Sequence, residues 1–392
     1  MVHRELTARD LDGAALLDLI RDEDPLGVVS IYVDMPADGA DRRAEIEVKN
    51  QMADLEREVA RYGPPHRQEA LRSAIRRAMP AVERLLDPRT TGRGGAVFSS
   101  LSAAAVTSLA TPLPLASRVV LDSRPFIQPL LELLDEGSPA GVVLTSSRAA
   151  ELFDWRLGNL GRLIRVTREF ADDAGERPGP LVASAAGAPF VTRAREQQSR
   201  RERDRQMRWI EQVAAEVVRL TDEREWERIL VSGDERLTVP LVEALPDRLR
   251  GVVLLDPRHL HESDHSSLAE DVAERLMEDR AGRNADLSRR VRAAALGAQR
   301  GALGLSEVVA ALNEGRVEHV IYDSARRYTG GIGPDGSLFA EGERLGLGKE
   351  EPRLLERIVE RALHTGARVT PLDGSAAGRL ADADGIAALL RW

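Results

Sequence analysis

Arginine gathers in one stretch of the chain, RAREQQSRRERDRQMRW, which runs from Arg193 to Trp209. Its guanidinium groups, with the glutamine and serine side chains beside them, are donors that proteins use to bind the phosphates of nucleic acids. The simpler alternative is the solvent-exposed start of a helix, with pairs four residues apart such as Glu196 with Arg200. Aromatic residues do not alternate with the arginines, so we expect contacts to the phosphate backbone and no stacking on bases.

The rest of the chain is acidic, which makes this arginine stretch a local exception. The 392 residues contain 55 Lys and Arg against 64 Asp and Glu, for a net charge of −9. A molecule of that charge does not wrap nucleic acid with its whole surface, so any contact with RNA must be local. The stretch from Arg193 to Trp209 is therefore the predicted place of contact.

Composition also excludes several kinds of chemistry. The chain has no cysteine, which rules out disulfides, thiolate metal sites, iron–sulfur clusters and cysteine nucleophiles. No apolar run approaches the ~20 residues of a membrane helix, and the charged N-terminus does not resemble a signal peptide. We therefore expect a reducing, cytoplasmic location, with neither a membrane nor DNA as a partner.

Two other groups of residues could hold a ligand. A polar segment carries side chains that can bind zinc: His259, His261, Asp264 and His265. A hydrated linker between domains is the favoured interpretation of that segment. Glycine-rich strings at residues 91–98 and 330–337 lack the lysine of a nucleotide-binding P-loop, and they predict a turn before a strand and a hairpin. No metal site and no cofactor are therefore predicted.

The elements that would position the arginines follow from hydrophobic patterning, and the chain length predicts two or three domains. The first segment combines a buried strand at 27–36, two amphipathic helices at 41–62 and 65–86, and further strands between 94 and 123. This order predicts a mixed α/β N-terminal domain at residues 1–136.

The arginine stretch lies in the second segment of the chain. Strand candidates at 141–147, 150–158 and 162–170 follow one another at the spacing of a β-meander. A helix with apolar residues three and four positions apart follows the arginines, and a strand, a helix and a strand come after it. This order predicts one mixed sheet with helices on its faces, in a middle domain at residues 137–265.

The last segment, residues 266–392, begins with helices and continues with a strand at 317–324. A helix at 351–364, another strand and the closing residues 384–392 follow. These elements predict an αβα domain at the C-terminal end.

Several motifs resemble the bacterial relatives of the archaeal and eukaryotic class-one release factor and Pelota. In that family a protruding loop of the middle domain reads Arg-Gly-Gly-Gln-Ser before an arginine-rich helix, and Arg195-Glu196-Gln197-Gln198-Ser199 stands in that place here. LSEVVAALNEGRVEHVIYDS at 305–324 resembles the helix–strand signature of the family's last domain, and GIAALLRW at 385–392 resembles its ending. The strands VVSIYVD and GGAVFSS resemble the N-terminal domain of the bacterial branch.

The resemblance implies a fold, a site and partners. The fold is α/β, with a mixed α/β N-terminal domain, a ribonuclease-H-like middle domain with a basic loop, and a C-terminal αβα domain of release-factor type. The implied partner is the ribosome, through rRNA of the A site, with tRNA and elongation factor Tu or another translational GTPase as further candidates. The RNA-binding side chains would be Arg193, Arg195, Gln197, Gln198, Ser199, Arg200, Arg201, Arg203, Arg205 and Arg208.

Departures from the family pattern determine the expected activity. In the family, the loop glycines let the backbone approach RNA closely, and the loop glutamine helps water to attack the ester of peptidyl-tRNA. Here Glu196 and Gln197 replace the glycines, and a carboxylate beside the ester would repel the forming oxyanion. We therefore expect no catalytic residue and no enzyme, but a factor of the ribosome hibernation and rescue branch (Balon-like) that occupies the A site without peptide release.

Two alternative functions remain beside this hypothesis. One is a peptidyl-tRNA hydrolase or tRNA nuclease that uses Gln198. The other is a protein–protein adaptor that makes no contact with RNA. Fold class alone does not separate the three, because one fold can carry unrelated functions.

Overall fold

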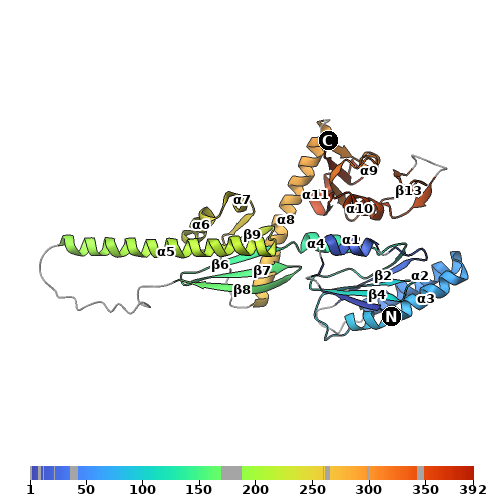
Figure 1. Cartoon of the computed structure of the whole chain (residues 1–392), viewed down its shortest axis with the longest axis horizontal. Helices are drawn as coiled ribbons and strands as arrows, with labels where there is room; N and C mark the ends of the chain where they lie inside the picture. The colour runs from blue at the N-terminus through green and yellow to red at the C-terminus, as the bar shows by residue number, and fades with distance from the viewer. Residues whose placement is uncertain are drawn as a thin grey trace. The chain divides into compact units, whose positions relative to one another are not determined.

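In the computed structural model the chain folds into two compact units (Figure 1). Unit 1 consists of Met1–Gly137 and Glu278–Trp392, and unit 2 consists of Ser138–Met277. The residues that the structure describes are 2–7, 10–11, 13–21, 23–35, 43–168, 188–258, 260, 265–297, 300–341 and 348–392. The first and last segments of the chain share unit 1, and the division into domains at 1–136, 137–265 and 266–392 stays a prediction.

The N-terminal part of unit 1 is built on a five-stranded sheet with the order β1-β4-β3-β2-β5. Its strands are β1 Val2–Leu6, β2 Val28–Asp34, β3 Gly94–Ser100, β4 Ala105–Thr111 and β5 Arg118–Asp122. Strands β2 and β3 pair antiparallel in the middle, and nearly every residue of both is buried. Burial on both faces explains why these two strands are continuous apolar runs without alternation.

Helices cover this sheet because their apolar residues recur every three or four positions. They are α1 Gly13–Arg21, α2 Arg43–Tyr62, α3 Pro65–Leu85 and α4 Gln128–Glu136. Residues such as Met52 of α2 and Leu71 of α3 join Val29 and Ile31 of β2 in one core. The helix predicted at 65–86 is confirmed, and the helix predicted at 41–62 is confirmed from Arg43 onward.

The C-terminal part of unit 1 has a four-stranded sheet with the order β11-β17-β12-β16 and a small sheet with the order β14-β13-β15. The strands are β11 Gly301–Leu303, β12 Val317–Asp323, β13 Gly330–Ile332, β14 Leu338–Ala340, β15 Lys349–Glu351, β16 Arg368–Leu372 and β17 Ile386–Leu390. The helices beside them are α9 Leu305–Asn313, α10 Leu354–His364 and α11 Gly374–Gly378. Strands β13 and β14 form the hairpin that the glycine-rich string at 330–337 predicts.

Unit 2 contains a five-stranded sheet with the order β10-β9-β6-β7-β8. Its strands are β6 Ala140–Thr145, β7 Ala149–Arg156, β8 Asn159–Thr167, β9 Arg228–Gly233 and β10 Val253–Asp256. Strands β6, β7 and β8 form the predicted antiparallel meander, and β9 and β10 then add in parallel beside β6. This mixed sheet confirms the α/β class, and the ribonuclease-H-like type of the middle domain stays an expectation from the resemblance.

Helices lie on both faces of the unit 2 sheet. They are α5 Ala188–Arg224, α6 Glu235–Ala244, α7 Asp247–Arg250 and the beginning of α8 His265–Leu296. Val143 and Val231 face a core with α5, α6 and α7, whereas Val142 and Phe153 face a second core with Leu268 of α8. Alternate residues of one strand therefore serve two different cores, as the two-residue period of a strand requires.

Candidate nucleic-acid interface

Helix α5 carries every residue of the predicted RNA-binding set, and its two halves differ in their surroundings. The packed half, residues 209–224, buries Trp209, Ile210, Val213, Val217 and Leu220 against the sheet. These residues follow one another at intervals of one, three and four, which places them on one helix face. The packed half therefore fixes the direction of the whole helix.

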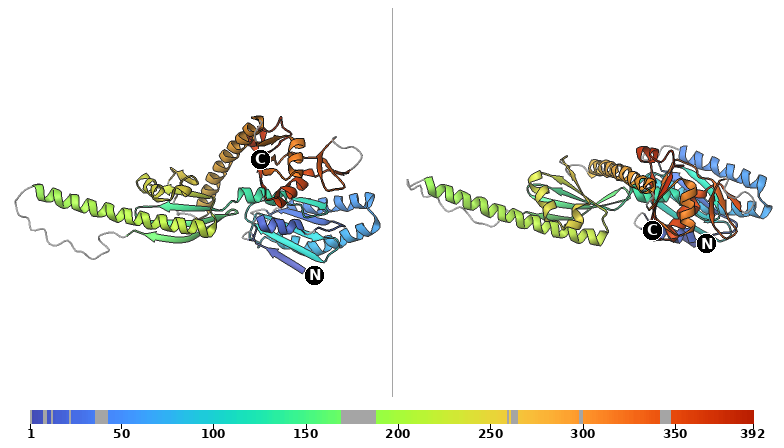
Figure 2. Two further views of the ribbon diagram at one scale, coloured as in Figure 1. Left: turned by 45° about the horizontal axis from the view of Figure 1, so that its top comes forward. Right: turned by 90° about the horizontal axis from the view of Figure 1, so that it is seen from above.

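The other half of α5, residues 188–208, is the projecting half. Figures 1 and 2 show α5, in green, continuing well beyond the edge of the unit 2 sheet. At 1.5 Å per residue, this half extends over roughly 30 Å. Between residues 197 and 208, every side chain that the structure describes is exposed or half-buried. The described exposed side chains of the projecting half are thus accessible to a partner.

Sequence explains why the projecting half is helical although its described side chains from 197 to 208 are exposed or half-buried. Arginine, glutamine, glutamate and alanine are all good helix formers, and they dominate this stretch. The packed half supplies the nucleus, so each further residue adds to an existing helix. The loop expected at 195–199 from the family motif is therefore wrong, because those residues belong to α5. Without the two glycines, nothing in this segment opposes the helix.

The described residues of the projecting half carry excess positive charge. Between 197 and 208, five arginines stand against Glu202 and Asp204. Arg200, Arg201 and Arg203 are exposed, and none of them forms an ion pair with another described residue. Gln197 and Ser199 are exposed beside them. Exposed guanidinium, amide and hydroxyl groups on one helix are suited to the phosphate backbone of RNA.

Two other predicted arginines have partners on their own helix. Arg205 lies 3.8 Å from Glu202, and the Nε of Arg208 donates to the backbone oxygen of Asp204 at 3.3 Å. Both contacts are at the surface, where an ion pair contributes about 0–1 kcal/mol and is easily exchanged. Arg201, Arg205 and Arg208 are four and three residues apart, so their Cα atoms lie on one face of α5. The side chains of Arg193, Arg195 and Gln198 lie outside the described residues.

A contact that the sequence analysis missed holds the base of the projecting half. Arg168, just after β8 and 8% exposed, donates from Nη2 to Glu202 at 2.6 Å and to Gln206 at 3.3 Å. Gln206 in turn donates to the backbone oxygen of Arg236 at 3.3 Å. One turn further along, the indole of Trp209 donates to the backbone oxygen of Val166 at 3.1 Å. No spacing rule connects Arg168 with Glu202, because they come from different elements.

The structure describes the remaining candidate sites of the sequence only in part. His259, His261 and Asp264 lie outside the described residues, as does the side chain of His265. In the part of the chain that is described, no cluster of three or more metal-binding side chains occurs. The string at 91–98 leads into strand β3, which confirms the predicted turn before a strand.

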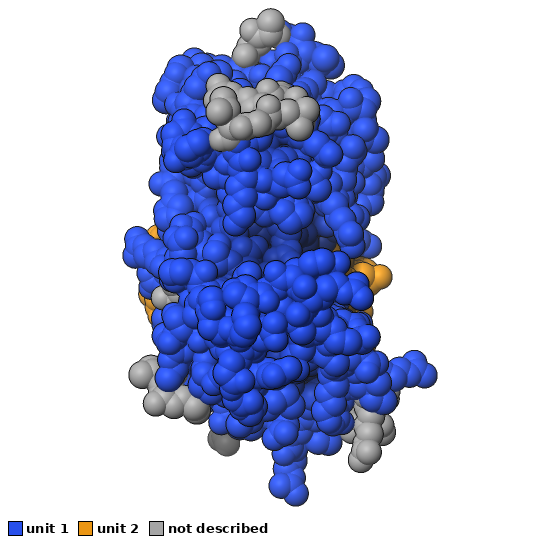
Figure 3. Space-filling view, turned by 90° about the vertical axis from the view of Figure 1, so that its right-hand side faces the viewer, with its two compact units in different colours: residues 1–137, 278–392 blue, residues 138–277 orange. Residues whose placement is uncertain are grey.

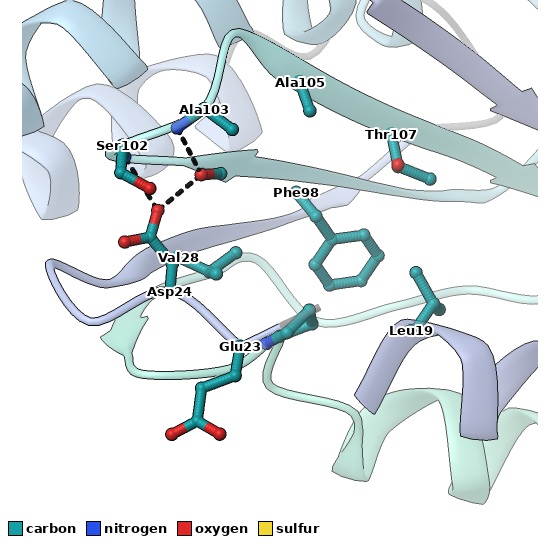
Figure 4. Close-up of a pocket in the computed structure, with 11 residues that line it drawn as sticks. Leu19, Glu23, Asp24, Val28, Phe98, Ser102, Ala103, Ala105 and Thr107 are labelled. Atoms are coloured by element: carbon teal, nitrogen blue, oxygen red, sulfur yellow. Dashed lines mark hydrogen bonds between the residues drawn. The ribbon is translucent and has the colours of Figure 1, made fainter. Parts of the chain in front are cut away.

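A small cavity in the N-terminal part of unit 1 was not predicted. It has a volume of about 190 Å³, and the apolar side chains of Leu19, Val28 and Phe98 form much of its wall (Figure 4). Asp24 lies at its polar edge, where it accepts hydrogen bonds from the Ser100 hydroxyl and, at 2.7 Å, from the backbone nitrogen of Ser102. These bonds connect the loop before β2 to the end of β3 and the loop after it.

The negative charge of Asp24 is stabilised by hydrogen bonds from within the fold. Burial by itself raises the pKa of this carboxyl, but hydrogen bonds from Ser100, Ser102 and Leu26 outweigh burial and lower the pKa to about 2. A carboxylate with so many internal donors has little capacity left for a ligand. The cavity is therefore a structural feature beside a loop anchor, and the projecting half of α5 remains the stronger candidate site.

Residues 125–281 match the family model described as bacterial archaeo-eukaryotic release factor family 10. No curated protein matches the chain. Among the described residues, no helix is long and apolar enough to cross a bilayer.

Three of the similar solved structures are translation factors or their relatives. The archaeal translation termination factor aRF1 is 17% identical over 99% of both chains, with a TM-score of 0.25. Archaeal Pelota, in a model of its ribosome-bound form with ABCE1, is 13% identical over 73% of this chain and 72% of its own, with a TM-score of 0.41. Dom34 of S. cerevisiae is 10% identical over 73% of this chain and 72% of its own, with a TM-score of 0.43.

Proposed function

We propose that this chain, a bacterial relative of the archaeal and eukaryotic release factors through its match at residues 125–281, is a ribosome-binding translation factor. It enters the ribosomal A site in hibernation or in the rescue of stalled ribosomes, and it does not release the peptide. It is not an enzyme. Its place of action is the cytoplasm, where ribosomes are found.

The observation that carries this proposal is the projecting half of α5. The described side chains at its exposed positions add little to the stability of unit 2, yet Arg200, Arg201 and Arg203 form no ion pair with a described carboxylate. Phosphate groups of rRNA would supply the missing anions, and each contact releases counterions from the RNA. The net charge of −9 keeps the rest of the surface from binding RNA without selectivity.

The helical state of residues 195–199 supports an occupant that does not catalyse ester hydrolysis. In a helix, backbone N–H groups are engaged by the carbonyls four residues earlier, so they are not free to approach a tRNA ester. Glu196 adds a negative charge where an oxyanion would form. A translational GTPase, elongation factor Tu in bacteria, is the proposed partner of the C-terminal part, on the family resemblance of residues 305–324.

Co-sedimentation with 70S ribosomes tests the proposal. Two triple variants of equal net charge are compared with the wild type. The first replaces Arg200, Arg201 and Arg203 by alanine, on the projecting half. The control replaces Arg219, Arg248 and Arg250 by alanine, three exposed arginines elsewhere in unit 2 that pair with Glu216, Asp222 and Asp247.

We expect the wild type and the control to sediment with ribosomes and the first triple variant to remain in the supernatant. Equal sedimentation of the two triple variants would contradict the role of the projecting half and would favour the adaptor function. A peptide-release assay on ribosomes with peptidyl-tRNA in the P site distinguishes the enzyme alternative from the proposed non-catalytic function. Release that is lost in Gln198→Ala would establish the hydrolase and overturn the non-catalytic role.

A further inference from the structure

Six charged side chains, four of them largely buried, meet between the N-terminal and C-terminal parts of unit 1. Figure 3 shows one face of unit 1 in blue. The N-terminal part contributes residues at the end of β5 and just after it, and the C-terminal part contributes α10 and the residues before it. We call the following set the charge network: Asp122, Arg124, Glu351, Arg353, Arg357 and Glu360.

Arg357 of α10 is the centre of the charge network. Its Nη2 donates to Asp122 of the N-terminal part at 2.5 Å, and its Nη1 donates to Glu360 at 2.8 Å. Its Nε donates to Glu351 at 3.3 Å. The side chain of Arg357 is 10% exposed, and those of Asp122 and Glu360 are 14% and 8% exposed. Of the three carboxylates around this guanidinium, only Asp122 belongs to the N-terminal part.

Two further arginines, one from each part, donate hydrogen bonds to the other part. Arg353 of the C-terminal part donates from Nη1 to the backbone oxygen of Leu121 at 3.0 Å and to Asp122 at 3.1 Å. Arg124 of the N-terminal part donates to Glu360 at 2.8 Å. Each part therefore supplies both a cation and an anion that the other part completes.

Glu356 lies on the same helix and is 4% exposed. Its Oε2 accepts the backbone N–H of Ile127, from the residue before α4, at 3.3 Å. Its Oε1 accepts no hydrogen bond from a described residue. A buried carboxyl with one weak donor is far more stable protonated than ionised.

The groups that act on Glu356 come from every side of this buried region. Burial is the largest influence and raises its pKa to about 8, with Glu360 of α10 and Asp122 of β5 acting in the same direction. The Ile127 N–H and Arg357 act against them. Two buried phenols, Tyr32 of β2 and Tyr322 of β12, also interact with this carboxyl, and its negative charge raises their pKa values further after burial has raised them.

A buried ionic contact differs from an apolar core in what happens when it opens. Removing two charges from water offsets much of their attraction, so an apolar contact of the same size is often more stable. The charges regain their hydration when the two surfaces separate, whereas apolar surfaces would not. A contact made of charges is therefore suited to parts that separate and rejoin.

We propose that the charge network and Glu356 form a proton-dependent latch between the N-terminal and C-terminal parts of unit 1. The latch holds while the Glu356 carboxyl keeps its proton. When that proton is lost, a carboxylate faces Glu360 and Asp122 without a matching cation, and the two parts separate. This inference does not depend on ribosome binding.

The direction of the pH dependence follows from where Glu356 titrates. In separated parts the carboxyl is in water and ionises near its ordinary pKa of 4.5, whereas in the latched unit its pKa is about 8. Between these values the latched state holds one more proton than the open state. The ratio of latched to open molecules therefore falls by up to tenfold for each pH unit between about 5 and 8, and it changes no further above that range.

A distance measurement in the full chain tests the latch. The chain has no cysteine, so Tyr62→Cys in α2 and Ser375→Cys in α11 give one exposed labelling site on each part. Pulsed electron paramagnetic resonance then reports the distribution of distances between two spin labels at pH 5, 6.5, 8 and 9.5. We expect a single short distance at pH 5 and a longer population that grows up to pH 8 and then stays constant.

Variants of this labelled chain distinguish the effect of the Glu356 proton from the effect of the ion pairs. Glu356→Gln keeps the size of the side chain and cannot ionise, so the short distance should persist at every pH. Arg357→Met leaves Asp122 and Glu360 without their central cation, so the longer population should dominate at every pH. The matched control is Arg289→Met in the same unit, because this side chain is 62% exposed and its one ion-pair partner among the described residues is Asp286.

Three results would overturn the latch. These are a Glu356→Gln protein that keeps the pH dependence, an Arg357→Met protein whose distances equal those of the control, and a wild type with one distance at all four pH values. Circular dichroism establishes that each variant is folded. If Arg357→Met does not fold, Arg124→Gln replaces it, because Arg124 lies at the rim with a side chain 27% exposed and joins Glu360 to Glu23. An open population in Arg124→Gln no larger than in the control would equally overturn the latch.

Discussion

Arg168, just after strand β8, donates a hydrogen bond of 2.6 Å to Glu202 of helix α5. The two residues are 34 positions apart in the chain, and the segment between them includes the start of α5. The side chain of Arg168 is 9% exposed, so the contact is largely shielded from water. It fastens the projecting half of α5 at the point where the helix leaves the sheet.

Arg168→Met should therefore destabilise unit 2. The substitution leaves the Glu202 carboxylate and the Gln206 amide without their shared partner, and such a loss costs about 1–3 kcal/mol of unfolding free energy. Denaturant unfolding followed by tryptophan fluorescence measures it. The control is Arg165→Met, because the Arg165 side chain on β8 is 58% exposed and its partner Glu151, 12% exposed, also has Arg162 within 3.9 Å. A change in Arg168→Met no larger than in Arg165→Met would contradict the anchoring role.

Trp209→Ala should destabilise unit 2 more strongly. The indole is 5% exposed within the core that α5 shares with the sheet, and removing a buried aromatic ring costs about 3–5 kcal/mol. The neighbouring Met207 is 45% exposed, and Met207→Ala should change the unfolding free energy by less than about 0.5 kcal/mol. Similar losses in both variants would mean that the boundary between the two halves of α5 lies elsewhere.

Salt should weaken ribosome binding, and the steepness of this effect should increase with the number of arginines that contact phosphate. Replacing Arg200, Arg201 and Arg203 by alanine removes up to three phosphate contacts. The slope of log binding constant against log salt concentration should then become shallower by about 2 to 3. Titrations at four salt concentrations give this slope. A weaker binding constant with an unchanged slope would indicate that the variant disturbs the fold and not the phosphate contacts.

His319 in strand β12 should contribute less to the stability of unit 1 in mild acid than at neutral pH. Its ring lies 2.8 Å from the Thr370 hydroxyl and is 6% exposed. Burial, with help from Arg368 and Arg290, lowers the pKa of His319 to about 4 from its ordinary 6.5. Between pH 6.5 and 4, His319 is therefore protonated in the unfolded chain and neutral in the folded chain.

The contribution of His319 is complete above pH 6.5 and is lost as the pH falls from 6.5 towards 4. The loss amounts to roughly 3 kcal/mol at most over that window. Unfolding of the wild type and of His319→Gln is compared at pH 7 and pH 5. We expect the loss between these two values to be smaller in the variant, and an equal loss in both proteins would remove His319 as its cause.

Local patterning was enough to predict most elements of this chain. The buried runs of β2, β6 and β9 and the periodicity of α3 are properties of neighbouring residues, so the structure confirms them within a few residues. The meander of three strands and the mixed sheet of unit 2 were also predicted and are confirmed, whereas the strand order β10-β9-β6-β7-β8 came only from the structure.

The loop expected at 195–199 shows where a motif can mislead. Helix propensity in that stretch already favoured a helix, since arginine, glutamine and glutamate follow one another without a glycine. The family motif pointed the other way because its loop depends on two glycines that are absent here. The local chemistry of the residues present was the better guide.

Composition, element types and the concentration of arginine in one segment were determined by the sequence by itself, because each depends on residues close together in the chain. Tertiary structure alone decided which charges remain exposed and which become buried. Arg357 meets Asp122 across 235 positions, and Arg200 meets no described carboxylate at all. The physical reason is that an ion pair depends on distance in space and on the exclusion of water, and packing sets both.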